Sequence, residues 1–247
     1  MVSKAKVKNL NNLIRITPAT VNQEKIFREY ATGKHLLIHG SAGTGKTLIS
    51  LYLGLNDVLD RVNGFRKLLI IRSCVPARAQ GFLPGDPAEK DAIFESPYEY
   101  LCSKLSDQQG AYKAFKAMDY IDFKSTSYLR GETFEHSIIL VDEVQNFNEG
   151  EINTIVTRTG HSSRLIICGD EEQNDLMYLR ENSCIDNLVR TVKRMPSFST
   201  IEMNVDDICR DGVVKEWILA RQQLAKEANL PRFIREGVGF VKEGVVK

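Results

Sequence analysis

One stretch, from His35 to Thr47, constrains the fold of this chain more than any other. An apolar run leads into a turn with three glycines, and the residues after the turn have the pattern of a helix. Glycines let the backbone wrap closely around a polyphosphate, and the N-terminus of a helix favours an anion. The segment Gly40-Ser41-Ala42-Gly43-Thr44-Gly45-Lys46-Thr47 therefore predicts a phosphate-binding loop (P-loop), in which Lys46 contacts the β- and γ-phosphates and Thr47 binds Mg²⁺.

A second apolar run, from Ser137 to Val141, ends in the carboxylates of Asp142 and Glu143. This pattern predicts a buried parallel strand with an acidic tip. We expect Asp142 to hold Mg²⁺ opposite Thr47, directly or through water, and Glu143 to polarise the water that attacks the γ-phosphorus. The pair favours nucleotide hydrolysis over a small-molecule kinase, in which a positioned water base would be harmful. An ordinary surface acid at a strand end is the alternative interpretation of Glu143.

Three polar residues near other element ends are further candidates. Gln173 follows the apolar run 165–168, where its amide can report whether the γ-phosphate is intact. Gln23 lies on the approach to the P-loop and can offer a donor and an acceptor to an adenine edge. Arg72 follows the apolar run 68–71 and is expected at the carboxyl edge of the sheet, where ligands bind in open α/β folds. Closure of a turn by Gln173 and an exposed helix start at Gln23 are the alternatives.

Length and composition fit one α/β domain. The 247 residues carry a net charge of +1, so the total charge does not demand a nucleic-acid partner. The cysteines, at positions 74, 102, 168, 184 and 209, form no C-x-x-C pair, which predicts reduced thiols and no zinc site. No apolar run reaches the roughly 18 residues that a membrane span needs, and no signal-peptide core follows the basic residues near the N-terminus. We expect a soluble, cytoplasmic protein with no membrane partner.

Hydrophobic periodicity predicts a lead-in at 1–19, a core at 20–229 with a helical insertion at about 87–118, and a tail at 230–247. Strands are expected near 35–40, 68–71, 120–123, 137–141, 165–168 and 199–203. Helices are expected after Thr20, after the P-loop as far as Asp60, within the insertion with an interruption at Pro97, and over 151–159, 182–194 and 206–228. The last helix is expected to open at Arg210 and to turn Val213, Val214, Trp217, Ile218 and Leu219 inward.

Five motifs together resemble the PhoH-like family of P-loop ATPases. They are the P-loop, Gly81-Phe82-Leu83-Pro84-Gly85-Asp86, Tyr128-Leu129-Arg130-Gly131, Val141-Asp142-Glu143-Val144-Gln145-Asn146, and Gly169-Asp170 with Gln173-Asn174-Asp175, in family order over roughly residues 17–222. The resemblance is to the short, phage-type members without the PIN nuclease domain of some bacterial relatives, so it implies no nuclease activity. One departure is Arg72-Ser73, where many bacterial members have Arg-Pro.

The resemblance implies a fold, cofactors and roles for single residues. The implied fold is α/β, a single RecA-like P-loop NTPase domain similar to the core of superfamily-1 helicases, with a mostly parallel sheet flanked by helices. The implied cofactors are ATP and Mg²⁺. The implied contacts are Gln23 with the adenine side, Lys46 and Thr47 with phosphate and metal, Asp142 and Glu143 with metal and water, and Gln173 with the γ-phosphate. Arg210, in Asp207-Ile208-Cys209-Arg210, corresponds to an arginine typical of the family.

Assembly follows from the presence of one core. A superfamily-1 motor closes its site with arginines from a second core, and this chain is too short to hold both. We therefore expect a homo-oligomer, with a hexameric ring as one form of it, in which Arg210, Arg72 or Arg130 reaches the γ-phosphate bound by a neighbour. A surface arginine or an intrachain ion pair is the alternative for each of the three.

Single-stranded RNA or DNA is the expected macromolecular partner, since some family members unwind RNA as ring-shaped oligomers. Two basic clusters can track a nucleic-acid backbone: Arg61, Arg66 and Lys67, and Arg190, Lys193 and Arg194. Solvated surface charge is the alternative for both. The competing functional class is a nucleotide-dependent switch or scaffold that binds a protein and hydrolyses slowly. Stimulation of hydrolysis by single-stranded nucleic acid that falls as salt rises would favour the motor.

Overall fold

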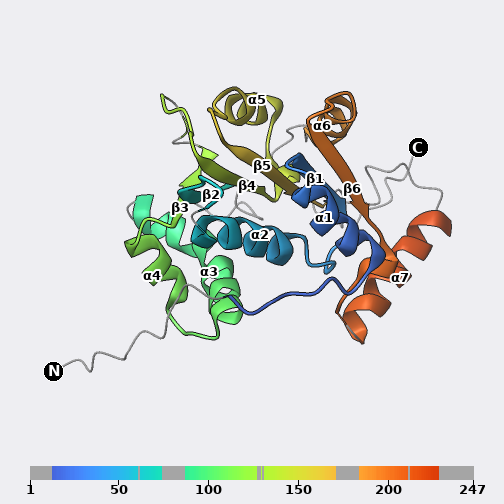
Figure 1. Ribbon diagram of the computed structural model, residues 1–247. Coiled ribbons are helices and arrows are strands. Elements are labelled where there is room, and N and C mark those ends of the chain that lie inside the picture. The colour runs from blue at the N-terminus through green and yellow to red at the C-terminus, as the bar shows by residue number, and fades with distance from the viewer. Residues whose placement is uncertain are drawn as a thin grey trace.

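The computed structural model describes residues 13–60, 62–73, 87–126, 129, 131–170, 184–210 and 212–227. Within these residues, seven α-helices flank one six-stranded sheet (Figure 1). The strands are β1 (His35–Gly40), β2 (Lys67–Arg72), β3 (Ile121–Ser125), β4 (Ser137–Asp142), β5 (Arg164–Gly169) and β6 (Phe198–Met203). The α-helices are α1 (Val21–Ala31), α2 (Lys46–Asp60), α3 (Pro87–Ser106), α4 (Ala111–Ala117), α5 (Glu149–Thr157), α6 (Ile185–Val192) and α7 (Val213–Glu227). Two single-turn 3₁₀ helices used below are η2 (Val144–Asn146) and η4 (Val205–Asp207).

All strand pairs in the sheet are parallel, in the order β3-β2-β4-β5-β1-β6. Parallel neighbours need long crossover connections, which explains why helices alternate with strands along much of the chain. The strand β5 lies between β1, which leads into the P-loop, and β4, which ends at Asp142. This is the arrangement of a RecA-like P-loop NTPase domain. The prediction of a single α/β domain with a parallel sheet flanked by helices is confirmed.

Buried apolar residues alternate along each central strand between two cores, because successive side chains of a strand point to opposite faces. On β4, Ile138 and Leu140 pack with helices α1 to α4, whereas Ile139 and Val141 pack with α5 and α6. We call the first side of the sheet the α2 face and the second the α5 face; Figure 1 shows α2, α3 and α4 on one side and α5 and α6 on the other. By the same alternation, Asp142 falls on the α2 face.

The predicted interruption of the insertion at Pro97 is wrong, because α3 continues through this residue. A proline inside a helix leaves the carbonyl four residues earlier without its usual N–H donor. Here the hydroxyl of Ser96 donates to the carbonyl of Ile93 at 3.1 Å and replaces the missing donor. The helical run breaks instead between α3 and α4, where Asp107 and Gly110 have φ of 53° and 75°.

The C-terminal helix begins later than the sequence predicts. Residues 205–207 form η4, and α7 begins only at Val213, so Arg210 precedes the helix and does not open it. The cause is local. Asn204 caps the start of η4, but Ile208, directly after η4, has an extended backbone with φ of −69° and ψ of 112°, so the turn cannot continue into a longer helix.

The predicted inward side of α7 is also largely wrong. Val213, Trp217 and Leu219 are 74%, 64% and 44% exposed, Val214 is half-buried, and Ile218 is buried. An apolar stripe along a helix indicates a side suited to burial, but the stripe alone does not decide whether another element covers it.

The N-terminal segment contacts the insertion. The N–H of Ile14 donates to the carbonyl of Leu105 at 2.7 Å, so this part of the segment lies against the end of α3.

None of the helices in the described ranges has both the length and the apolar character that crossing a membrane requires.

Candidate nucleotide-binding site

The P-loop joins the end of β1 to the start of α2. Gly40, Gly43 and Gly45 have φ of 116°, 73° and 85°, a region that residues with a Cβ rarely adopt. A Cβ at Gly40 would also lie 2.0 Å from the carbonyl oxygen of Met203 on β6. The glycine pattern is therefore required by the backbone geometry of the loop and by its close approach to the sheet.

Polar side chains of the P-loop are anchored on the loop's own backbone. The ammonium group of Lys46 donates to the carbonyls of Gly40 at 2.7 Å and Ser41 at 2.8 Å, and the hydroxyl of Thr44 donates to Ser41 at 3.0 Å. Ala42 is half-buried within the same turn. Because Lys46 is the first residue of α2, its charge and the positive end of the helix dipole lie at the same place. This combination suits a bound polyphosphate.

Asp142 connects β4 to the P-loop. One carboxylate oxygen, Oδ1, accepts a hydrogen bond from the hydroxyl of Thr47 at 3.0 Å, although the residues are 95 positions apart. The other oxygen, Oδ2, accepts one from the hydroxyl of Tyr98 on α3 at 2.8 Å. Burial, and then the charge of Glu143, raise the pKa of Asp142 above its ordinary value. The structure thus brings together Thr47 and Asp142, the two residues predicted to bind the metal.

Glu143 directly follows β4 and has a left-handed backbone with φ of 56°, which is uncommon outside glycine. Its Oε2 accepts a hydrogen bond from the side-chain amide of Gln145 at 2.5 Å. The amide oxygen of Gln145 accepts in turn from the backbone N–H of Asp170, just beyond β5, at 2.9 Å. Gln145 is buried and orients Glu143 against the neighbouring strand. Sequence reasoning gave Gln145 no role, although its place in the acidic motif, two residues after Glu143, was a usable signal.

Gln23 is buried on α1 and bridges three segments, so it is not an exposed helix start. Its Nε2 donates to the carbonyl of Thr44 in the P-loop and to the sulfur of Cys209, both at 3.0 Å. Its Oε1 accepts from the N–H of Ala19 at 2.8 Å. The side chain therefore lies against the P-loop, and its contact with adenine stays a prediction.

Arg72 lies at the carboxyl end of β2, in register with Asp142. Its guanidinium carbon is 5.9 Å from the centre of the Phe94 ring on α3. Burial alone would lower the pKa of Arg72, but Tyr98, Asp142 and Glu143 outweigh that effect and raise it. Arg72 is therefore engaged within its own chain, beside the acidic end of β4.

Arg210 is exposed and lies beside the P-loop of its own chain. A Cβ placed on Gly43 would be 3.4 Å from Cδ of Arg210, and the N–H of Cys209 donates to the carbonyl of Gly43 at 3.1 Å. Three other predicted features, Gln173, Arg130 and the motif Gly81–Asp86, lie outside the described residues.

The donor set at the P-loop fits Mg²⁺. The hydroxyl of Thr47 and the carboxylate of Asp142 are hard oxygen ligands, and Mg²⁺ uses one or two such groups together with substrate phosphates and water. Within the part of the chain that the structure describes, no group of three or more His, Cys, Asp or Glu side chains is arranged to hold a metal. A site completed by phosphate oxygens is consistent with that finding.

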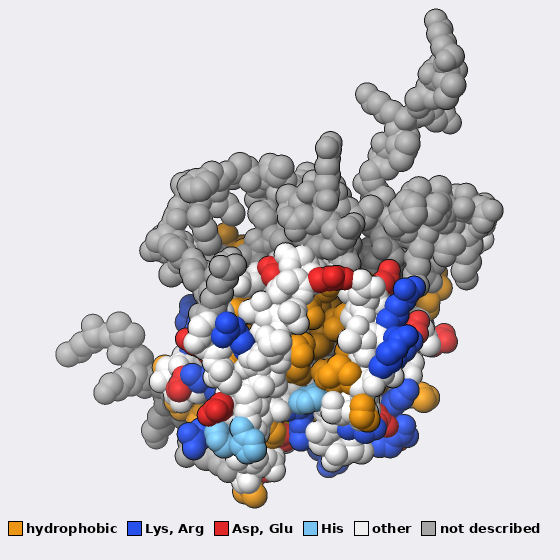
Figure 2. Space-filling model, turned by 90° about the horizontal axis from the view of Figure 1, so that it is seen from above, with side chains coloured by type: hydrophobic (Ala, Val, Ile, Leu, Met, Phe, Trp, Pro, Cys, Tyr) orange, Lys and Arg blue, Asp and Glu red, His pale blue; other side chains and the backbone are white. Residues whose placement is uncertain are grey.

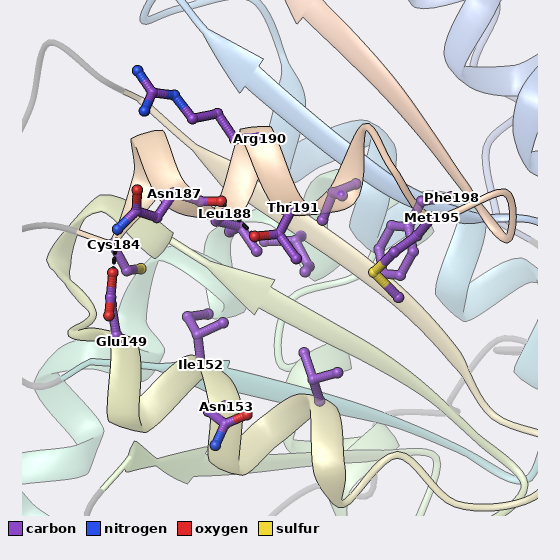
Figure 3. Close-up of a pocket in the computed structure, with 13 residues that line it drawn as sticks. Glu149, Ile152, Asn153, Cys184, Asn187, Leu188, Arg190, Thr191, Met195 and Phe198 are labelled. Carbon is purple, nitrogen blue, oxygen red and sulfur yellow. Dashed lines mark hydrogen bonds between the residues drawn. The ribbon is translucent and has the colours of Figure 1, made fainter.

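The α5 face contains a hollow of about 410 Å³ between α5 and α6, seen as an apolar depression in Figure 2 and in close-up in Figure 3. Its apolar lining includes Ile152, Val156, Leu188, Val192, Met195 and Phe198. Glu149 and Asn187 meet in a hydrogen bond across the rim. Arg190 points away from the hollow in Figure 3. This chemistry suits apolar contact and offers little to a nucleotide phosphate, so the P-loop remains the candidate nucleotide site.

The chain is similar in sequence to a known family of proteins. The family model described as "PhoH-like protein" matches residues 15–222. Protein PhoH2 of Bacillus subtilis is 33% identical over 66% of this chain and 38% of its own length, and a PhoH-like protein of the same organism is 31% identical over 73% and 56%. Protein PhoH of Escherichia coli K12 is 32% identical over 56% and 39%. The chain thus matches between 38% and 56% of these relatives' lengths.

The solved structures that resemble this chain have a lower sequence identity to it than these relatives have. The large terminase of a thermophilic bacteriophage, in complex with ADP, gives a TM-score of 0.47 at 12% identity over 83% of this chain and 50% of its own. The Pif1 helicase of Candida albicans gives a TM-score of 0.43 at 12% identity over 87% and 46%.

Proposed function

The chain belongs to the PhoH-like protein family, and from that premise we propose that it hydrolyses ATP with Mg²⁺ at the P-loop and couples hydrolysis to single-stranded RNA or DNA. The observation that carries the proposal is the hydrogen bond between Thr47 and Asp142, which joins the phosphate loop to the acidic strand. Glu143 is the next residue, and Gln145 orients its carboxylate.

Each residue has a role in this reaction. The backbone N–H groups of the P-loop and Lys46 bind the phosphates, while Thr47 and Asp142 would hold the metal. When bound, Mg²⁺ neutralises charge on the β- and γ-phosphates. Glu143 accepts a proton from the attacking water, whose oxygen bonds to the γ-phosphorus as the bond to the ADP oxygen breaks. The products are ADP and inorganic phosphate.

The test is Glu143→Gln, which keeps the size of the side chain and removes the base. We expect kcat for ATP hydrolysis to fall by about 10²- to 10⁴-fold, while the affinity for a fluorescent ATP analogue stays close to wild type. Glu202→Gln on β6, an exposed acid, is the matched control and should hydrolyse normally. Wild-type turnover by Glu143→Gln would refute the assigned role.

Nucleic-acid binding is supported best by the cations of α6 and its end. Arg190, Lys193 and Arg194 are all exposed within about two helical turns. In the other predicted cluster, Lys67 is paired with Asp119 at 2.6 Å and Arg61 lies outside the described residues. We therefore assign the backbone contact to the α6 cluster.

The double variant Arg190→Ala/Arg194→Ala tests this assignment. We expect it to lose stimulation of ATP hydrolysis by single-stranded RNA or DNA and to flatten the dependence on salt, with basal hydrolysis unchanged. Lys104→Ala/Lys113→Ala removes the same charge from exposed positions on α3 and α4 and should behave as wild type. A wild-type protein that is indifferent to both polymers would favour the switch or scaffold instead.

We also propose a homo-oligomer, for which the exposed apolar residues of α7 are the support. Val213, Trp217 and Leu224 are 74%, 64% and 64% exposed and follow one another along one side of the helix. Because Trp217 is the single tryptophan of the chain, its emission should shift to shorter wavelength on assembly. Sedimentation across a range of concentrations measures the assembly, and a monomer throughout would contradict it.

A further inference from the structure

Helix α3 reaches the candidate nucleotide site, although it belongs to the segment that the sequence marks as an insertion. Phe94 and Tyr98 lie four residues apart and therefore on the same side of the helix. Phe94 lies under the guanidinium of Arg72, and the hydroxyl of Tyr98 donates to Asp142. Arg72 and Asp142 are register partners at the ends of β2 and β4. One side of α3 thus contacts two neighbouring charged groups at the carboxyl edge.

Tyr98 is placed for a specific task. Its side chain is fully buried and packs 6.1 Å, between ring centres, from Phe123 on β3. A phenol is protonated at neutral pH and a carboxylate only accepts, so the hydroxyl of Tyr98 is the donor in its contact with Asp142. The hydrogen bond to Asp142 measures 2.8 Å, a good length for an O–H donor and a carboxylate.

We infer that Tyr98 is a positioning residue for Mg²⁺ binding, which fixes the carboxylate of Asp142 so that Thr47 and Asp142 present their oxygens to the metal together. The hydroxyl of Tyr98 donates to Oδ2 of Asp142, and the hydroxyl of Thr47 donates to Oδ1. Because the hydrogen of the Thr47 hydroxyl points at Asp142, the lone pairs of its oxygen stay available to a metal. The inference rests on the proposed function, since it assumes that magnesium-bound nucleotide binds at the P-loop.

Removal of the Tyr98 hydroxyl would leave Oδ2 without this donor in a buried place, where Asp142 is 4% exposed. The carboxylate could then rotate, and the Thr47 hydroxyl would lose a fixed acceptor. Groups that orient metal ligands in this way commonly change metal affinity or activity by about 10- to 100-fold when they are mutated. The effect should therefore appear in the metal-dependent part of nucleotide binding.

The experiment compares Tyr98→Phe with Tyr112→Phe by titrating a fluorescent ADP analogue with Mg²⁺ present and with EDTA. Tyr112 is a matched control, because it is buried on α4 and its hydroxyl donates to the carboxylate of Glu95 at 2.5 Å, within the same insertion. For Tyr98→Phe we expect a rise of about 10- to 100-fold in the Mg²⁺ concentration that gives half of the maximal increase in affinity for the ADP analogue. The affinity for the analogue in EDTA should stay unchanged. Tyr112→Phe should match the wild type in both conditions.

The outcomes separate this inference from the proposed function. A wild-type protein without magnesium-dependent nucleotide binding would refute the proposed function. A wild-type protein with such binding, matched by Tyr98→Phe, would overturn the inference alone. Equal losses in Mg²⁺ and EDTA would show a merely structural role and would also overturn it. Combining Tyr98→Phe with Asp142→Asn supplies a second measurement, because a residue that acts through Asp142 adds little once Asp142 is changed, whereas additive losses contradict the inference.

Discussion

Within the residues that the structure describes, helices cover the two faces of the sheet to different depths. The α2 face carries α1, α2, α3 and α4, of 11, 15, 20 and 7 residues, whereas the α5 face carries α5 and α6, of 9 and 8 residues. Helix α7 does not enter this comparison, because it lies largely exposed beyond η4. Where this cover buries a polar group, such as the carboxylate of Asp142, a hydrogen-bond partner is needed, because burial without one is costly.

The chemistry of each face follows from its cover. On the α2 face, the carboxylate of Asp142 is buried with a hydroxyl donor on each oxygen, an arrangement that fixes its geometry. On the α5 face, apolar residues such as Leu188 line a hollow whose rim is joined by exposed polar groups. The hydrogen-bonded pair of Thr47 and Asp142 thus lies on the α2 face, which carries the longer helices. The α5 face, with shorter helices, keeps an open apolar hollow that is free for other contacts.

The largest expected effect is a difference in stability between matched core substitutions. Ile26 on α1 is 0% exposed, and Ile152 on α5 is 8% exposed and lines the hollow. Ile26→Ala should lower the free energy of unfolding by about 3 to 4 kcal/mol, and Ile152→Ala by about 1 to 2 kcal/mol, because the second creates little new enclosed cavity. Urea denaturation measures both. Equal losses would break the comparison of the two faces.

The second-largest expected effect on stability is at Asp207, whose hydrogen bonds join η4 to the start of α1. Its buried carboxylate accepts from Thr20 at 2.6 Å, Asn22 at 2.7 Å and the N–H of Asn204 at 2.9 Å. Asp207→Ala should cost about 2 kcal/mol at pH 7. The exposed neighbour Asp206 is the control, and Asp206→Ala should change stability by less than about 0.5 kcal/mol.

The pH dependence of the Asp207 contribution has a definite sign. Burial acts to raise the pKa of Asp207, but the hydrogen bonds from Asn22 and Thr20 outweigh it and lower the pKa. The stabilisation is therefore complete above the ordinary pKa of Asp and is lost as pH falls through the lowered folded value. The difference in unfolding free energy between wild type and Asp207→Ala should stay constant from pH 7 to about 4 and shrink below it. A difference that grows in acid would contradict this assignment.

Much of the fold could be predicted because its signals are local. The four inner strands β1, β2, β4 and β5 each contain a short apolar run. The P-loop glycines are required by backbone geometry that only glycine adopts easily. The pairing of Thr47 with Asp142 was predictable because parallel strands place their carboxyl ends on one edge. These features depend on residue type and spacing, which a single sequence displays.

The remaining features depend on contacts that spacing does not encode. Tyr98 lies 44 positions from Asp142 and reads as one more apolar residue of an amphipathic helix. Pro97 reads as a break, since the compensating hydroxyl of Ser96 is visible only in three dimensions. Trp217 reads as a core residue, since its exposure depends on which elements lie beside it in the folded chain. The role of Tyr98 and the exposure of Trp217 are decided by tertiary structure, whereas the continuity of α3 at Pro97 is decided by a side-chain hydrogen bond within the helix itself.

The smallest expected effect tests the thin face directly. The amide of Asn187 on α6 donates to the carboxylate of Glu149 on α5, and this exposed hydrogen bond crosses the rim of the hollow (Figure 3). Asn187→Ala should lower the free energy of unfolding by less than about 0.5 kcal/mol, because water replaces an exposed partner at little cost. Tyr98→Phe, which removes one hydrogen bond from the buried α2 face, should cost about 1 to 3 kcal/mol in the same urea experiment. If Asn187→Ala cost as much as Tyr98→Phe, the two helices of the α5 face would be held as firmly as α3, and shallow cover would no longer explain the open hollow.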